Sequence, residues 1–290
     1  MSDLVDQLGH PPDTALVILT ADDLGSSHAA NVGVYEAIRD GMATSASLMV
    51  PGPWAREAAS RYRGEDVGVH LTVNAEYDLV RWGPITLAPS LFDGDGGFPR
   101  TVDDLAEHAD IDELRRECRA QLERAIYWGF DVSHLSSHLG AMERRPELFD
   151  VILELCVEFG LPLRLPDVTL EDDFGFPFRS LAGAEGVVSP DRLVRVPVPM
   201  GPGRTRAAAR RAAERALFDL QPGVTEICFR PALDGPELRA MAPDWPARVD
   251  DLELLVADRA LASLAHRAGA VLIGYRVLRD LQRERQGTRA

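Results

Sequence analysis

The sequence predicts an α/β protein whose fold is a TIM-barrel-like (β/α) barrel, incomplete or distorted. Two observations support this prediction. Short apolar segments typical of buried strands alternate with segments of helical periodicity, which favours a mostly parallel sheet. In addition, no change in composition marks a linker between domains. An open, doubly wound sheet is the alternative. In barrels, functional side chains gather at the carboxyl ends of the strands.

The expected domain runs from residue 15 to residue 283. Residues 1–14 are expected to be a flexible lead-in, and residues 284–290 a loose tail. Apolar runs bounded by glycine, proline or acidic residues predict the strands. The predicted strands are 15–20, 44–50, 67–73, 132–139, 161–165, 193–198, 225–229 and 270–275. The predicted helices are 28–40, a short one ending near 62, one ending near 129, 146–159, 205–219 and 249–267.

Two irregular segments, 77–100 and 166–205, interrupt this alternation. Long loops in compact domains often serve as lids or binding loops. Their aromatic residues could form a flat surface for a sugar or could simply pack the loops. These residues are Tyr77, Trp82, Phe92, Phe98, Phe174, Phe176 and Phe178.

Composition narrows the range of partners and of locations. The net charge of −15 argues against nucleic acid or an anionic membrane as a partner. Three cysteines without a CxxC pair predict buried, reduced thiols. No secretory leader and no apolar stretch of about 18 residues is found, which predicts a cytoplasmic location. Neither GxGxxG nor GxxxxGK[ST] occurs, so nucleotide binding has little support.

Adjacent acids close the first predicted strand, where Asp22 and Asp23 follow a continuous apolar run. Two like charges so close together resist joint ionisation unless a cation or a proton intervenes. This pattern indicates a site in which one acid binds a metal and the other remains free to move protons. Either acid could instead cap the following helix.

Histidines end two later strands: His70 follows one apolar run, and His134 and His138 lie in another. One carboxylate and two imidazoles would form a ligand set that leaves positions open for water and substrate. Each histidine alone could be a hydrogen-bonded core residue. Because His134 and His138 are an even number of residues apart, they share a face of a regular strand. Both could bind metal, or one could support the other.

At these residues the chain resembles the YdjC-like (ChbG-like) carbohydrate deacetylase family. The matching segments, in the family's order, are Thr20–Gly25, Asn31–Ala37, Gly41–Met49, Val67–Thr72, Ser133–His138, Thr225–Pro231 and Arg248–Asp251. The resemblance implies a TIM-barrel-like fold and one divalent metal ion, Mg²⁺ or Zn²⁺. It also implies removal of acetyl groups from N-acetylated sugars such as chitooligosaccharides. A homodimer is compatible with it.

The resemblance also implies roles for individual residues. The expected metal ligands are Asp23, His70 and His138, and the expected general base is Asp22. The residues expected to support the site or bind substrate are His134, Asn74 and Arg248.

Two residues depart from the family pattern. Ser136 occupies a position that commonly holds an acid, and Arg230 replaces a histidine thought to protonate the leaving amine. Because arginine is not deprotonated in proteins, Arg230 cannot carry that proton. As a catalytic residue it could instead stabilise an oxyanion, or it could bind an anionic group.

The leading interpretation is therefore a metal-dependent hydrolase acting on an N-acetylated sugar or a related small molecule. Arg230 leaves open a catalytically impaired, metal-bearing barrel that binds a sugar. An iron oxygenase could use the same types of ligand.

Overall fold

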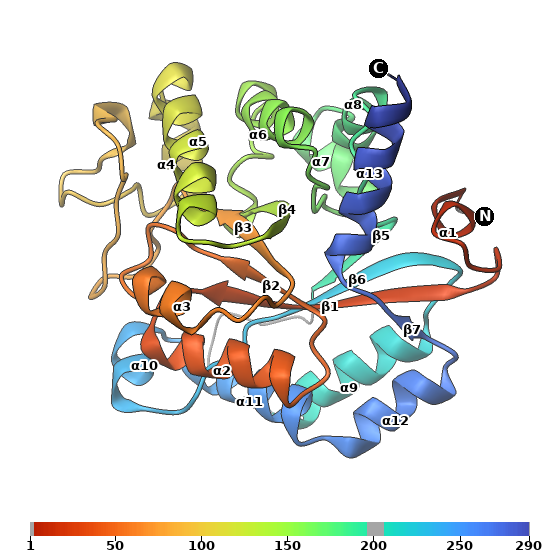
Figure 1. The fold of residues 1–290 in the computed structure, drawn as a ribbon. Coiled ribbons are helices and arrows are strands. Elements are labelled where there is room, and N and C mark those ends of the chain that lie inside the picture. Colours follow the sequence, from red (N-terminus) through yellow and green to blue (C-terminus); the bar gives the residue numbers. More distant parts are fainter. Residues whose placement is uncertain (1–2, 196–205, 290) are drawn as a thin grey trace.

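Seven parallel strands form an open, curved sheet in the computed structural model, which describes residues 3–195 and 206–289. They are β1 (Ala15–Leu24), β2 (Ser45–Leu48), β3 (Val67–Leu71), β4 (Val132–Ser137), β5 (Arg192–Arg195), β6 (Gly223–Phe229) and β7 (Val271–Leu272). The order across the sheet is β4-β3-β2-β1-β6-β5, and β7 pairs with β1. Surrounded by helices, this sheet is a half-barrel (Figure 1), so the predicted distorted (β/α) barrel is confirmed.

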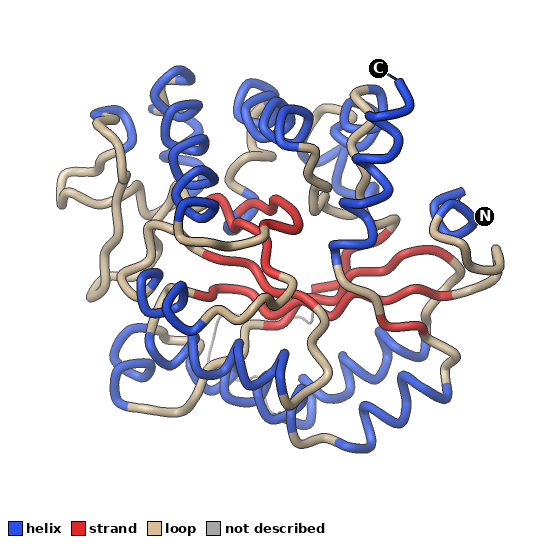
Figure 2. Tube along the Cα trace, viewed as in Figure 1, coloured by secondary structure: helices blue, strands red, loops and turns tan. Residues whose placement is uncertain are grey.

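Helices cover the sheet on both sides (Figure 2). The first six are α1 (Asp3–Gln7), α2 (His28–Arg39), α3 (Ala55–Arg61), α4 (Val102–His108), α5 (Ile111–Tyr127) and α6 (Pro146–Phe159). The others are α7 (Glu171–Phe174), α8 (Phe178–Ala184), α9 (Arg206–Phe218), α10 (Pro236–Met241), α11 (Trp245–Val256), α12 (Arg259–Arg267) and α13 (Tyr275–Arg289). Helices α2, α9, α11 and α12 lie on one side of β1, and α5, α6 and α13 lie on the other (Figure 1).

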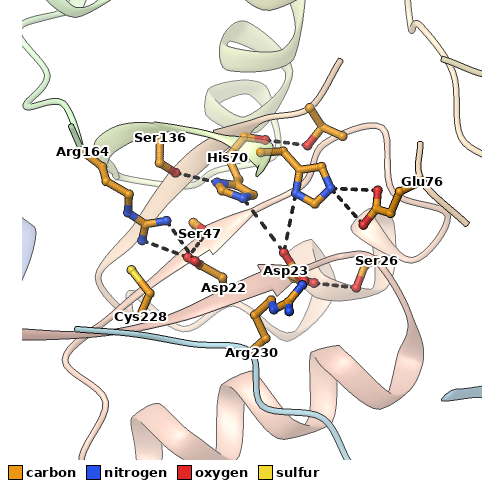
Figure 3. A network of polar contacts seen from close by, with 12 residues as sticks. Asp22, Asp23, Ser26, Ser47, His70, Glu76, Ser136, Arg164, Cys228 and Arg230 are labelled. Carbon is orange, nitrogen blue, oxygen red and sulfur yellow. Dashed lines mark hydrogen bonds and ion pairs between the residues drawn. The ribbon is translucent and has the colours of Figure 1, made fainter. Parts of the chain in front are cut away.

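The central strand β1 carries the acid pair within the strand, not after it. Its apolar run is buried, as the sequence predicts for a strand covered on both faces. The pairing register with β2 shifts between Ala21 and Leu24, and Asp23 has a φ of 68°. Successive side chains of a regular strand point to opposite faces. The irregularity at Asp23 breaks this alternation and brings both carboxylates to the same region (Figure 3).

Several predicted boundaries need correction. The predicted helix 249–267 is two helices, α11 and α12, because Asp258 caps the second by accepting from the amides of Ala260 and Leu261. The predicted strand 161–165 forms one isolated bridge, between Leu163 and Leu135. Strand 270–275 shortens to β7, because Tyr275 begins α13. Of the predicted strand 193–198, the part beyond 195 lies outside the described residues.

The two ends of the chain also differ from the expected loose segments. Helix α1 occupies part of the predicted lead-in, and its Leu4 and Val5 are buried with Leu16, Val224 and other core residues. Helix α13 continues through most of the predicted tail to Arg289. Both segments contact the rest of the chain: Leu4 and Val5 pack into its core, and Gln286 Nε2 donates to the Val157 carbonyl over 3.4 Å.

The three cysteines are buried and unpaired, as predicted. Phe174, Phe176 and Phe178 pack against one another, and the latter two also contact Phe149, so these rings fill the space beside α6. Within residues 3–195 and 206–289, no helix is both long and apolar enough to cross a membrane.

Candidate metal centre

The three expected metal ligands converge at the carboxyl ends of their strands. Asp23 comes from β1, His70 from β3, and His138 follows β4 directly. One potential ligand atom from each lies within 4.8 Å of the others, and all three residues are buried. Asp23 Oδ1 lies 4.0 Å from His70 Nε2 and 3.8 Å from His138 Nδ1 (Figure 3). Among the described residues, His138 Nδ1 has no hydrogen-bond partner. A buried, unpaired nitrogen facing a carboxylate fits a cation-binding site.

Each of these three side chains is held on the side away from the others. His70 Nδ1 is 2.7 Å from the Ser136 hydroxyl, and His138 Nε2 is 3.0 Å from Glu76 Oε2. Such partners fix the orientation of a ligating imidazole and select its tautomer. Ser136, the departure from the family pattern, therefore still supports a histidine of the site.

Arg248 supports the carboxylate of the same cluster. Its Nη1 donates to Asp23 Oδ2 over 2.8 Å, which leaves Asp23 Oδ1 toward the histidines. Its Nη2 donates to the Tyr77 hydroxyl over 2.6 Å, and its Nε donates to Asp244 over 3.1 Å. Each nitrogen of the Arg248 guanidinium thus donates a hydrogen bond, and the residue is buried. The predicted supporting role of Arg248 stays a prediction.

The electrostatics of the cluster favour an anionic Asp23 and a neutral His70. Burial opposes the charge of Asp23, but Arg248 and the nearby histidines outweigh it, and the Asp23 pKa falls well below its usual range. Burial lowers the pKa of His70 to about 3, although the charges of Asp22 and Asp23 raise it. Burial also lowers the pKa of His138, but Glu76 and Asp23 reverse the shift and raise it overall. A cation would therefore compete with a proton mainly at His138.

Asp22, the expected general base, lies beside this cluster, and both of its carboxylate oxygens accept hydrogen bonds. Arg164 donates from Nη1 to Oδ2 and from Nη2 to Oδ1, each over 2.9 Å. The Ser47 hydroxyl donates to Oδ1 over 2.6 Å (Figure 3). Burial raises the pKa of Asp22, but Arg164 and His70 outweigh it, so the net shift is downward. Asp22 is therefore ionised at neutral pH.

Arg230 directly follows β6 and lies next to Asp23 (Figure 3). Its Nη2 is 3.1 Å from Asp244 Oδ2, and its backbone amide donates to Asp251 over 2.9 Å. The Arg230 side chain is 20% exposed, whereas that of Arg248 is 2% exposed, so solvent reaches Arg230 and not Arg248. Of these two arginines, Arg230 is the one that a bound ligand could approach.

The remaining predicted residues lie outside the ligand cluster. His134 is buried, its Nδ1 is 3.0 Å from the Ser133 hydroxyl, and its ring stacks on Tyr275. Asn74 is buried, and among the described residues its side-chain amide has no hydrogen-bond partner. Its carbonyl accepts from Trp82 Nε1 over 2.8 Å. A substrate-binding role for Asn74 stays a prediction.

Sequence reasoning missed three residues that contact this site: Ser47, Glu76 and Arg164. Arg164 could have been found from the sequence, because it is a single charged residue within the apolar segment Leu161–Leu165. Glu76 lies in an irregular loop where no periodicity marks it, and Ser47 is an ordinary small residue within a strand. Two of the loop aromatics also lie here: Tyr77 contacts Arg248, and the rings of Trp82 and His138 meet edge to face at 6.4 Å.

Comparison with known proteins connects this geometry to a family. A carbohydrate deacetylase from Thermus thermophilus is 38% identical over 251 residues, which cover 86% of this chain and 89% of the relative. A carbohydrate deacetylase from Geobacillus stearothermophilus is 30% identical over 272 residues, covering 89% of this chain and 96% of the relative.

Among solved structures, one from Enterococcus faecalis V583, named for a proposed role in cellobiose-phosphate cleavage, shares the fold. Its TM-score is 0.77 at 23% identity, and the match covers 91% of this chain and 99% of that one. The sequence profile described as YdjC-like protein matches residues 16–266. The chain therefore belongs to the YdjC-like family.

Proposed function

We propose that this protein is a metal-dependent hydrolase that removes the acetyl group from an N-acetylated sugar. The observation that carries the proposal is the convergence of Asp23, His70 and His138 beside the second carboxylate, Asp22. Relatives that share most of the chain are named carbohydrate deacetylases, which supports this reaction class. A chitooligosaccharide or a related glycan is the proposed substrate class.

The donor set suits a divalent cation of the zinc type. Two imidazoles and one carboxylate favour Zn²⁺ over Mg²⁺, because Mg²⁺ prefers oxygen ligands. Asp23, His70 and His138 would hold the ion, with Arg248, Ser136 and Glu76 fixing their orientation. When bound, such an ion polarises a carbonyl group and lowers the pKa of a coordinated water.

Asp22 is the proposed general base. As an ionised carboxylate close to the ligand cluster, it would accept a proton from the water that attacks the acetyl carbonyl. Arg164 and Ser47 would hold the carboxylate in place during this transfer. Asp22 could then return the same proton to the leaving nitrogen as the C–N bond breaks, so that water and amide become acetic acid and amine, which exchange a proton to give acetate and an ammonium group. This route requires no second acid at position 230.

Arg230 is the proposed electrostatic partner of the reacting carbonyl. Its guanidinium lies beside Asp23 (Figure 3). A fixed positive charge stabilises an oxyanion that develops next to it. Arg230 would therefore act on charge rather than on a proton.

The test measures acetate release from N-acetylated mono- and oligosaccharides by protein with measured metal content. We expect release by the Zn²⁺-loaded protein and its loss after chelation. Asp22→Asn should reduce kcat by about 10²- to 10⁴-fold while retaining the metal. No release from any substrate at full metal occupancy would refute the proposal and favour a sugar-binding barrel without activity.

A further inference from the structure

The interior of the half-barrel next to Asp22 contains a buried polar cluster. Barrel interiors are usually filled by branched apolar side chains. Here Glu226 of β6 is fully buried and accepts several hydrogen bonds. Its Oε1 accepts from Arg164 Nε over 2.9 Å, from Arg164 Nη2 over 2.6 Å and from the Thr20 hydroxyl over 2.6 Å. Its Oε2 accepts from the Tyr275 hydroxyl.

Arg164 connects this cluster to the proposed general base. The same guanidinium that donates to Glu226 donates to both oxygens of Asp22. Because the guanidinium group is planar and rigid, its contact with Glu226 determines how its other edge faces Asp22. Glu226 thus influences the orientation of Asp22 without touching it.

Tyr275 fixes the far side of Glu226. It is the first residue of α13, and its ring stacks on His134 with a centroid separation of 3.7 Å and an interplanar angle of 14°. The His134 ring packs directly on Gly68 of β3. The contact is so close that a Cβ built on Gly68 would lie 2.3 Å from His134 Nδ1. The Tyr275 hydroxyl is therefore held against Glu226 by a tightly packed ring pair.

Stability alone does not account for such a cluster. Replacing buried ion pairs with well-packed apolar side chains is often neutral or stabilising. The cluster instead leads, through Arg164, to one carboxylate at the site. We propose that Glu226 and Tyr275 are positioning residues, which orient Arg164 so that it holds Asp22 toward the cluster of Asp23, His70 and His138. This inference rests on the proposed function for its catalytic consequence.

The test compares Glu226→Gln and Tyr275→Phe with the wild-type enzyme. Glu226→Gln nearly preserves the shape of the side chain but removes the charge that holds Arg164, and Tyr275→Phe keeps an aromatic ring stacked on His134. We expect Glu226→Gln to lower kcat by about 10- to 100-fold, in the range of a small misplacement of a catalytic group. Tyr275→Phe should have a smaller effect of the same kind. In both variants, KM and the Kd for Zn²⁺ should remain within about threefold of wild type.

Ile152→Val is the matched control, since Ile152 is fully buried in α6. It should lower the Tm without changing kcat, which separates positioning from general destabilisation. Unchanged kcat in a folded Glu226→Gln variant would overturn the inference. So would losses that follow the Tm and also appear in Ile152→Val.

A crystal structure of Glu226→Gln distinguishes this inference from the proposed function. We expect at least one of the two Arg164–Asp22 contacts, 2.9 Å each in the native chain, to be lost. If both remain, the positioning role fails even when the wild-type enzyme is active. If they are lost but the wild type releases no acetate, the proposed function fails and the positioning role stands.

Discussion

Glu76→Gln tests whether the carboxylate next to His138 controls metal affinity. The Glu76 carboxylate lies 3.0 Å from Nε2, so it holds that nitrogen protonated and leaves Nδ1 free on the side of Asp23. Removing such a partner typically weakens metal binding by about 10- to 100-fold, or about 1.4 to 2.8 kcal/mol. The His138 side chain is 2% exposed and that of Glu76 is 16% exposed, so solvent screens the pair little. We expect the upper part of this range.

Ser136→Ala is the matched comparison at the other histidine. Its hydroxyl contacts His70 Nδ1 over 2.7 Å, but it carries no charge. Charge-assisted hydrogen bonds are about twice as strong as neutral ones. Ser136→Ala should therefore weaken binding by about tenfold or less. Glu154→Gln, which alters an exposed ion pair with Arg115, should leave metal affinity unchanged.

Titration calorimetry with Zn²⁺ measures all three affinities. Burial lowers the pKa of His138, and Glu76 contributes to its net rise, so a proton competes with the metal more strongly in the native chain than in Glu76→Gln. The difference between the two proteins should therefore shrink as the pH falls. A larger loss in Ser136→Ala than in Glu76→Gln, or equal losses in all three variants, would refute the reasoning.

Two further predictions concern stability. Gly68→Ala should lower the free energy of unfolding by about 1–3 kcal/mol, because the new Cβ would lie 2.3 Å from His134 Nδ1. Denaturant titration measures this change. Gly94→Ala is the control, and it should have little effect because no atom lies within 4 Å of its Cβ. Burial raises the pKa of Glu143 above its ordinary 4.5 in the native protein. As the pH rises above 4.5, this carboxyl group therefore ionises in the unfolded chain before it ionises in the native protein, and the free energy of unfolding falls. Glu143→Gln should remove this loss, so the Tm of the variant should rise relative to that of wild type from pH 4.5 toward neutrality. A Tm difference that stays constant over this range would contradict the assignment.

The sequence was sufficient to predict the features that depend on local pattern. Pro146 at the first turn and Gly160 with a φ of 59° bound α6 where the sequence predicts a helix. The convergence of acids and histidines at one edge was also predictable, because parallel strands bring their carboxyl ends to the same side of the sheet. Local signals therefore led to the fold class and to the site, whereas the choice of Asp23, His70 and His138 as ligands came from the family resemblance.

Contacts between distant residues could not be predicted in this way. Arg164 and Glu226 are 62 positions apart, and the link from Glu226 to Tyr275 spans 49 positions. Nothing in the periodicity of either segment specifies a charged partner on another element. Helix α1 poses the same problem, because five residues are too short to be stable alone and depend on the buried contacts of Leu4 and Val5.

The pairing of β1 with β6 has a consequence for biosynthesis. Ala15 pairs with Gly223, so the edge of the first strand that faces β6 has no partner until about 208 further residues have been synthesised, although β2 can pair with its other edge earlier. At about 5–20 residues per second, that interval is roughly 10–40 s. During it, an apolar segment with unsatisfied backbone groups would be open to association with other nascent chains. Cellular yield of this protein should therefore depend on chaperones that shield its first strand during translation.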